Sequence, residues 1–223
     1  MIDPTNITNY DMTQAELEEF LLFAISVAGK TAKQIAIALE KFLTDKSFYE
    51  ITRDVYFGFG DVGQETEYAD MSMSPFEKIR WLINKEQLKY AIINSKLGQH
   101  SKLDHAFREV VNKNLDLRTV TTEELEKIKG IGPKTSRFFI LHSQKNSQIA
   151  CLDTHILHWL KERGYKIPAN PPSGKKYLEI EKIFLSIAKK MKKDPATLDL
   201  EIWNALSKRS GLNTKEKELA KNH

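Results

Sequence analysis

Apolar residues recur at helical spacing along most of the chain. From about residue 14 to residue 27 they return every three or four positions, and the same period continues toward the C-terminal region. The helices expected from this pattern cover about 14–27, 32–43, 74–82, 86–96, 102–113, 122–129, 133–143, 154–163, 174–192 and 195–207. The sequence therefore predicts an all-α fold.

Local signals mark several of these helix starts. A capping box, in which two side chains satisfy each other's backbone amides, is expected at two of them, and an Asp-Pro pair opens the last helix. The residues are Thr13 with Glu16, Ser74 with Glu77, and Asp194 with Pro195.

Two segments interrupt the helical period. Asp54 to Asp70 contains three glycines and five acidic residues without a regular repeat, so we expect a long loop there. Ile167 to Gly174 contains three prolines and predicts a linker between the middle of the chain and its last helices.

Composition and charge narrow the class of protein. Of the 223 residues, 41% are apolar and 29% are charged, which is typical of a soluble globular protein. No run reaches the ~20 apolar residues of a membrane span, and the acidic start at Met1 to Pro4 lacks the basic end of a secretory signal. We therefore expect an intracellular protein, in the cytoplasm or nucleoid, with no membrane partner.

The charge is divided unevenly between the two halves of the chain. Residues 1–100 carry 10 Lys and Arg against 15 Asp and Glu, whereas residues 101–223 carry 24 against 15. A basic half suggests a surface for a polyanion such as nucleic acid. Lysine-rich solvated helices would give the same balance, so the charge alone leaves both interpretations open.

The single cysteine limits metal and redox chemistry. With Cys151 alone, an intramolecular disulfide, a Cys-rich zinc site and a four-cysteine iron–sulfur cluster are excluded. Its neighbours are Ala150 and Leu152, which favours a small core residue over a nucleophile. The histidines are scattered, so no metal or other cofactor is expected.

The most informative segment is a glycine-bracketed turn from Gly130 to Lys134. Its residues are Gly130, Ile131, Gly132, Pro133 and Lys134, with Lys127 and Lys129 just before them. Glycine lets the backbone approach a phosphate, and the free amides of the helix starting at Pro133 would form an anion site. An ordinary helix–turn–helix connection is the alternative, and the same turn also occurs in DNA-binding modules that perform no chemistry.

Lys134 and Asp153 are the candidate catalytic residues. Lys134 would lie in the first turn of its helix, where the dipole disfavours an ammonium and so favours the nucleophilic amine. Asp153, nineteen residues later, would start the helix from Thr154, where the dipole and capped amides hold a carboxylate ionised. Such an amine can attack the anomeric carbon of a nucleotide, and the carboxylate can stabilise the cationic sugar. Phosphate binding by Lys134 and simple capping by Asp153 remain alternatives.

These two segments resemble the helix–hairpin–helix DNA glycosylase superfamily. The match consists of Lys129 to Lys134 and of Leu152, Asp153, Thr154 and His155. In that superfamily a lysine at the place of Lys134 marks bifunctional enzymes, which remove the base and nick the strand by β-elimination. His155 would support the Asp153 helix or contact the DNA backbone.

Within the superfamily the chain is most similar to the type-2 8-oxoguanine DNA glycosylases. Asp199 and Trp203 stand in a segment like their C-terminal Asp-Leu-x-x-Trp helix, which implies a place in the base pocket, although Trp203 could equally be a core residue. Gly29 and Lys30 fall where these enzymes place a loop that fills the gap left by the extruded base. Thr154 stands where they commonly have arginine.

The resemblance also implies a domain organisation and an activity. One lobe would comprise residues 1–30 plus 150–223, and the other residues 31–149 with the helix–hairpin–helix at about 122–143; the cleft between them would carry Lys134 and Asp153. The expected function is a monomeric DNA N-glycosylase with AP-lyase activity on double-stranded DNA containing a damaged base, such as 8-oxoguanine. Another lesion (an oxidised pyrimidine or a deaminated base), a non-catalytic DNA-binding module and a helical adaptor are the alternatives.

Overall fold

The structure, a computed structural model, describes residues 1–56, 62–168 and 172–219. The chain folds into two compact units. Unit 1 comprises Met1–Pro4, Met12–Leu117 and Lys127–Gly130, and unit 2 comprises Thr5–Asp11, Arg118–Glu126 and the described chain from Ile131 onward. These bounds differ from those of the expected lobes, because the first long helix belongs to unit 1 and the helix after the glycine turn to unit 2. The lobe organisation stays a prediction.

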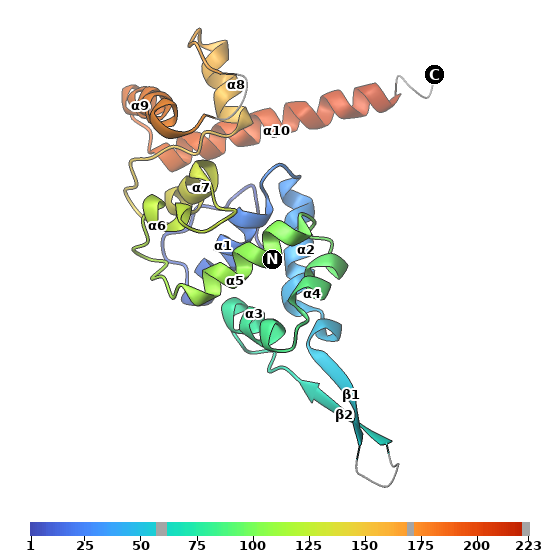
Figure 1. The fold of residues 1–223 in the computed structure, drawn as a ribbon. Coiled ribbons are helices and arrows are strands. Elements are labelled where there is room, and N and C mark those ends of the chain that lie inside the picture. Colours follow the sequence, from blue (N-terminus) through green and yellow to red (C-terminus); the bar gives the residue numbers. More distant parts are fainter. Residues whose placement is uncertain (57–61, 169–171, 220–223) are drawn as a thin grey trace. The chain divides into compact units, whose positions relative to one another are not determined.

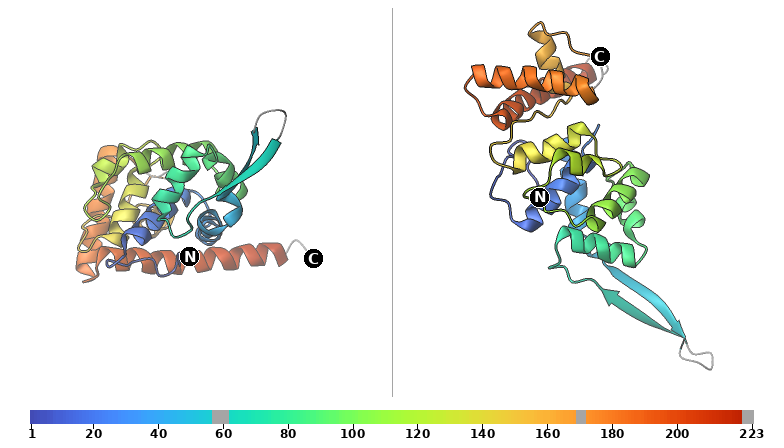
Figure 2. Two further views of the ribbon diagram at one scale, coloured as in Figure 1. Left: turned by 90° about the horizontal axis from the view of Figure 1, so that it is seen from below. Right: turned by 60° about the vertical axis from the view of Figure 1, so that its left-hand side comes forward.

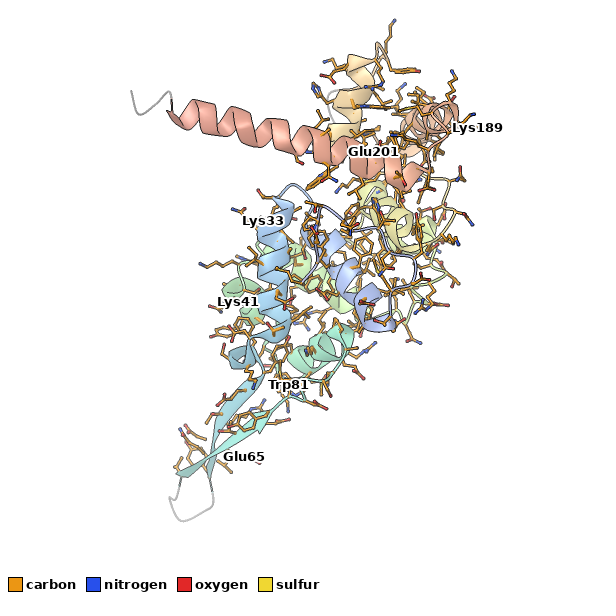
Figure 3. All side chains as sticks on the ribbon, turned by 180° about the vertical axis from the view of Figure 1, so that it is seen from behind. Lys33, Lys41, Glu65, Trp81, Lys189 and Glu201 are labelled. Atoms are coloured by element: carbon orange, nitrogen blue, oxygen red, sulfur yellow. The ribbon has the colours of Figure 1, made fainter. Side chains whose placement is uncertain are left out.

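Unit 1 is a bundle of helices that encloses an apolar core. Its helices are α1 (Gln14–Ser26), α2 (Ala32–Thr44), α3 (Pro75–Asn84), α4 (Leu88–Asn94) and α5 (His100–Asn112), with a 3₁₀ turn η1 (Lys46–Phe48). Helix α1 packs against α2, α3 and α5, and α5 also contacts α3 and α4 (Figure 1). Both expected capping boxes are confirmed, at Thr13 of α1 and Ser74 of α3. Trp81, which α3 carries (Figure 3), lies with its ring centroid 6.0 Å from that of Tyr49.

The expected loop at Asp54 to Asp70 is wrong for the residues that the structure describes. Strands β1 (Glu50–Tyr56) and β2 (Val62–Tyr68) form an antiparallel hairpin with Thr52 opposite Thr66, and residues 57–61 lie outside the described part. The hydroxyls of these threonines are 2.9 Å apart. The sequence shows little of the apolar–polar alternation that predicts a strand, because glycines and acidic residues are frequent here. On β1 only Ile51 and Val55 are partly buried apolar residues. The two strands extend away from the helices of unit 1 (Figure 2).

The described part of unit 2 contains five helices, and the longest of them contacts three of the others. These helices are α6 (Thr122–Glu126), α7 (Pro133–Ser143), α8 (Thr154–Glu162), α9 (Gly174–Lys190) and α10 (Pro195–Leu219). Helix α10 packs against α7, α8 and α9 (Figures 1 and 2). The core between α8, α9 and α10 consists of Ala150, Leu152, Ile156, Leu157, Trp159, Leu160, Tyr177, Ile180, Phe184, Ala188, Leu198, Ile202 and Leu206.

The fold class agrees with the sequence, since the described chain is mostly helical and its only sheet is the two-stranded hairpin. Helix α6 ends at Glu126, three residues earlier than expected, and α10 continues well past the expected end at 207. In the expected linker, residues 169–171 lie outside the described part, and α9 begins at Gly174. None of the helices that the structure describes has the length and apolar character needed to cross a bilayer.

Candidate active site

The glycine turn takes the conformation that its sequence requires. Gly130 has a φ of +103°, a region open to glycine, and a Cβ placed on it would lie 3.4 Å from both Ala106 Cβ and Lys102 Cγ. Gly132 is the N-cap of α7 with extended backbone, and Pro133 occupies the first helical turn. Ile131 is buried and anchors the turn. Because glycine has no side chain, α7 starts without a side-chain cap, which leaves its first amides and the positive end of its dipole for an anion.

Lys134 lies in the first turn of α7. Its Nζ atom is 4.9 Å from the centroid of the Phe138 ring, one turn further along the same helix, so the ring guides the ammonium along this face. The carbonyl oxygen of Lys134 accepts a weak hydrogen bond from the Cys151 thiol at 3.7 Å. Helix α7 is thereby joined to the segment that leads to Asp153.

Buried polar groups fix this segment. The amide of Ala150 donates to Glu181 Oε1 at 2.9 Å, and the amide of Leu152 donates to Tyr177 Oη at 2.9 Å. Glu181 in turn accepts from Arg137 Nε at 2.9 Å, and the Arg137 guanidinium lies 4.5 Å from the centroid of the Tyr177 ring. Since α7 and α9 both hold the segment, the residue that follows it has a defined position.

Asp153 is that residue, and it caps α8. Its Oδ1 atom accepts from the amide of Ile156 at 2.8 Å, while its own amide donates to the Cys151 carbonyl at 2.8 Å. Burial raises the pKa of Asp153, and the nearby Asp199 carboxylate raises it further. The capping bond from Ile156 and the charge of Lys134 oppose this shift but do not cancel it. The helix start is therefore not the only influence on the pKa of Asp153, because burial and a second carboxylate raise it.

Lys134 and Asp153 nevertheless lie within electrostatic reach of each other. The charge of Lys134 acts on the pKa of the Asp153 carboxyl, and both groups act on the Cys151 thiol. Cys151 itself is 2% exposed, and burial raises the pKa of its thiol, so it belongs to the core as expected. Unit 2 therefore brings an amine and a carboxylate from two helix starts into one site.

Asp199, on α10, is a buried carboxylate of unit 2. Its side chain contacts His142 of α7, with 3.2 Å between Asp199 Oδ2 and His142 Nε2. The other oxygen, Oδ1, is buried and has no hydrogen-bond partner among the described residues. Its expected place in a base pocket stays a prediction.

Trp203 and His155 form the aromatic part of the same unit. Their ring centroids are 6.4 Å apart with an interplanar angle of 85°, an edge-to-face contact. Both side chains are only half-buried, in contrast to Trp159, which belongs to the core of unit 2. Trp203 thus keeps a partly accessible ring, and its role in holding a base stays a prediction.

Besides Gly130, three of the expected DNA contacts belong to unit 1. Lys30 Nζ donates to the Leu97 carbonyl at 2.9 Å, and Gly29 has a φ of +72° with no atom within 4 Å of the place where a Cβ would lie. The amide of Lys129 donates to Glu109 Oε2 at 3.1 Å. These bonds order both loops, and DNA binding by Gly29, Lys30 and Lys129 stays a prediction. No group of three or more His, Cys, Asp or Glu that could hold a metal ion exists in the described parts of either unit.

Comparison with known proteins identifies the family. A family model described as 8-oxoguanine DNA glycosylase matches residues 67–193, more than half of the chain. The chain belongs to the 8-oxoguanine DNA glycosylase family. The β1–β2 hairpin lies almost wholly before the matched residues.

Curated relatives share the family name. An 8-oxoguanine DNA glycosylase/AP lyase of Aquifex aeolicus is 28% identical over 195 residues, which are 85% of this chain and 75% of the relative. One of Picrophilus torridus is 38% identical over 79 residues, which are 35% of this chain and 37% of the relative. The chain thus spans little more than a third of that relative's length.

Solved structures share the fold. The 8-oxoguanine DNA glycosylase of Thermotoga maritima has a TM-score of 0.56 at 21% identity, over 86% of this chain and 80% of that one. The Methanocaldococcus jannaschii 8-oxoguanine glycosylase/lyase, in complex with a 15mer DNA containing 8-oxoguanine, has a TM-score of 0.54 at 23% identity, over 90% of this chain and 85% of that one.

Sequence reasoning missed part of the site of this family member. Lys134, Phe138 and His142 are spaced by four residues and therefore share one face of α7, a signal that could have revealed the last two. Thr8, whose Oγ1 is 2.7 Å from His142 Nδ1, lies 134 residues away in the chain, and no local pattern points to it.

Proposed function

We propose that this member of the 8-oxoguanine DNA glycosylase family is a bifunctional DNA glycosylase and AP lyase. The observation that carries the proposal is the gathering of Lys134 and Asp153 at the starts of α7 and α8 in one unit, within electrostatic reach of each other. A module that binds DNA without chemistry would need the glycine turn but has no use for this pair.

Binding begins with the phosphate backbone of double-stranded DNA. The uncapped start of α7, from Gly132, offers amides and a positive dipole end to one phosphate. The damaged nucleotide of the bound DNA is extruded from the duplex before chemistry, because the bond to be cut is not accessible inside the base stack. Trp203, with its half-buried ring, provides a surface on which an extruded base stacks, beside His155.

Chemistry begins with Lys134. The neutral amine attacks C1′ of the extruded nucleotide, and the glycosidic C1′–N bond breaks with its electron pair leaving on the base, which takes up a proton. The lysine nitrogen, now bound to C1′, loses a proton; the C1′–O4′ bond then breaks, O4′ takes up a proton, and the nitrogen lone pair forms the C1′=N double bond of a Schiff base. Removal of a C2′ proton then expels the 3′ phosphate, which nicks the strand by β-elimination.

Asp153 stabilises the positive charge that develops on the sugar as the base departs. The carboxylate is fixed by its bond from Ile156, so it needs no reorganisation when the charge appears. It also exchanges a proton with the attacking nitrogen, a role supported by the effect of the Lys134 charge on the pKa of Asp153.

The proposed substrate is an oxidised purine, with 8-oxoguanine as its representative. This choice is supported by the family and by the names of the relatives from Aquifex aeolicus and Picrophilus torridus. The lysine–aspartate pair does not select this substrate by itself, because the same chemistry would remove any damaged base that can act as a leaving group.

Borohydride trapping tests the proposal. The protein is incubated with duplexes that carry 8-oxoguanine, an oxidised pyrimidine, a deaminated base or an abasic site, and the Schiff base is reduced to a stable adduct. We expect an adduct with 8-oxoguanine and with the abasic site, and none with Lys134→Gln. Tight DNA binding without an adduct on any duplex would identify a non-catalytic module, and a lack of salt-sensitive DNA affinity would leave only the adaptor.

A further inference from the structure

A chain of three polar side chains joins three separate segments of unit 2. Thr8, in the N-terminal segment Thr5–Asp11, has its Oγ1 atom 2.7 Å from His142 Nδ1 on α7. The opposite ring nitrogen, Nε2, is 3.2 Å from Asp199 Oδ2 on α10. The His142 side chain is fully buried and Asp199 is 6% exposed, so both ends of the imidazole are used and the ring has one orientation.

Asp199, at the end of this series of polar contacts, uses only one of its two carboxylate oxygens in it. Asp199 Oδ1 is buried and has no hydrogen-bond partner among the residues that the structure describes. A buried oxygen without a hydrogen-bond partner is unfavourable for folding, so stability alone does not account for this residue. His142 fixes which oxygen is left over, because it engages only Oδ2.

The packing of α10 places the helical turn that carries Asp199 against the segment that leads to Asp153. Ala196, one turn before Asp199 on the same face of α10, packs with Cys151 and Leu141 in one buried cluster. Cys151 stands two residues before Asp153, and the charge of Asp199 acts on both Cys151 and Asp153.

We propose that Thr8 and His142 are positioning residues that hold Asp199 beside Asp153 as a fixed negative charge, and that Asp199 thereby controls how readily Asp153 gains and loses a proton. The inference rests on the proposed function, in which Asp153 takes part in the reaction. A negative charge near a carboxyl disfavours its ionisation, so Asp199 makes it harder for Asp153 to lose its proton.

The other charged groups around Asp153 oppose this effect. Lys134 from α7 and His155 from α8 both favour the ionised carboxyl, as does the capping bond from Ile156. With Asp199 in place, burial and like charge outweigh them, and the pKa of Asp153 is raised. A carboxyl with a raised pKa exchanges protons closer to the pH at which the enzyme works, which suits a group that serves a departing base and an attacking amine.

Carboxyl ¹³C NMR titration of the full chain without DNA tests the positioning chain directly. Aspartate is labelled at Cγ, and the Asp153 signal is assigned through its loss in Asp153→Asn. We expect the pKa of Asp153 to fall in Asp199→Asn, which removes the charge in the same shape. A smaller fall is expected in Thr8→Val, which removes only the hydrogen bond to His142, and Thr8→Ser should restore the parent value.

The matched control is Asp194→Asn. It removes the same charge from the start of the same helix, where the carboxylate caps Ala196 and Thr197, and it should leave the pKa of Asp153 in place. An unchanged Asp153 pKa in Asp199→Asn, or identical curves for Thr8→Val and the parent protein, would overturn the proposal.

The activity readout separates this inference from the proposed function. In single-turnover excision of 8-oxoguanine, the acid limb of the rate–pH profile should move to lower pH in Asp199→Asn and, by less, in Thr8→Val. A protein without excision on any lesion would refute the proposed function, while the NMR titration would still decide on the positioning chain. If the protein excises 8-oxoguanine but neither Asp199→Asn nor Thr8→Val shifts the acid limb of the rate–pH profile, only the proposed roles of Thr8, His142 and Asp199 would be refuted.

Discussion

The starts of α7 and α8 look alike in backbone and differ in one side chain. Both N-cap residues are extended, with ψ of −179° at Gly132 and at Asp153. At α8 the Asp153 carboxylate satisfies the amide of Ile156, whereas α7 has no side-chain cap at all. The same local geometry therefore gives an open anion site at one helix and a fixed carboxylate at the other.

This difference in capping gives the two helix starts different roles. An uncapped start has to obtain its anion from outside the chain, and a DNA phosphate is such an anion. A capped start has its negative charge built in, and at α8 that charge lies within reach of Lys134. Capping and chemistry are combined in the single residue Asp153, so substitutions can separate them.

The largest effect is expected for Lys134→Gln. The side chain is one atom shorter and keeps a hydrogen-bond donor but loses the nucleophile, so excision should fall roughly 10³-fold or more, and trapping and nicking should disappear. The measurement is single-turnover excision and borohydride trapping on 8-oxoguanine and abasic duplexes. Lys189→Gln, an exposed lysine of α9 (Figure 3), is the control and should behave as the parent protein. Nicking at the parent rate would remove Lys134 from the mechanism.

The next effect separates the charge of Asp153 from its cap. Asparagine also accepts the bond from Ile156, so Asp153→Asn should fold normally and bind DNA while excision falls ~10²–10³-fold. Asp153→Ala should lose excision as well and, in addition, about 1 kcal/mol of stability with the cap. Excision rates, DNA affinity and urea unfolding are compared for the two variants. Full activity in Asp153→Asn would show that Asp153 only caps α8.

The two glycines of the turn make a matched pair of smaller effects. Gly130 has a positive φ and close neighbours, so Gly130→Ala should cost about 1–2 kcal/mol of stability. Gly132 has φ −106° and open space around its Cβ position, so Gly132→Ala should leave stability unchanged. If a phosphate approaches the start of α7, the added methyl should weaken DNA binding by about 1 kcal/mol, or roughly fivefold. Affinity for an abasic-analogue duplex checks this, and unweakened binding by Gly132→Ala would place the phosphate elsewhere.

Elements with strong local signals could be predicted from the sequence. The capping boxes at Thr13 and Ser74 each reside within four residues, and the glycine turn before α7 needs no distant partner. The β1–β2 hairpin was missed because its pairing, such as Thr52 with Thr66, spans fourteen residues and buries little apolar surface.

The same reasoning applies to the candidate site. Lys134 and Asp153 stand in recognisable segments, so their residue types and positions could be read directly. The raised pKa of Asp153 could not be predicted, because its causes are burial and a carboxylate 46 residues further along the chain. Thr8 and His142 become relevant only when three segments of unit 2 meet.

The smallest effect concerns stability, and it has a defined sign. The folded-state pKa of Asp153 is raised, so the stability that comes with its proton is present below the ordinary carboxyl range and is lost as the pH rises through the folded pKa. Asp153→Asn carries no titrating proton and keeps the cap. Its unfolding free energy should therefore increase relative to that of the parent protein as the pH rises through this window. Urea unfolding from about pH 2.5 to pH 8 measures the difference, because this range covers a raised carboxyl pKa and also reaches below the ordinary one. Asp70→Asn is the control of opposite sign, because hydrogen bonds from the backbone and side chain of Ser72 lower the pKa of Asp70, and its stabilising effect is lost as the pH falls. If the unfolding free energies of the two variants changed with pH in the same direction, the folded-state pKa of Asp153 would not be raised. Asp153 would then cap α8 in the way that an exposed carboxylate caps a surface helix.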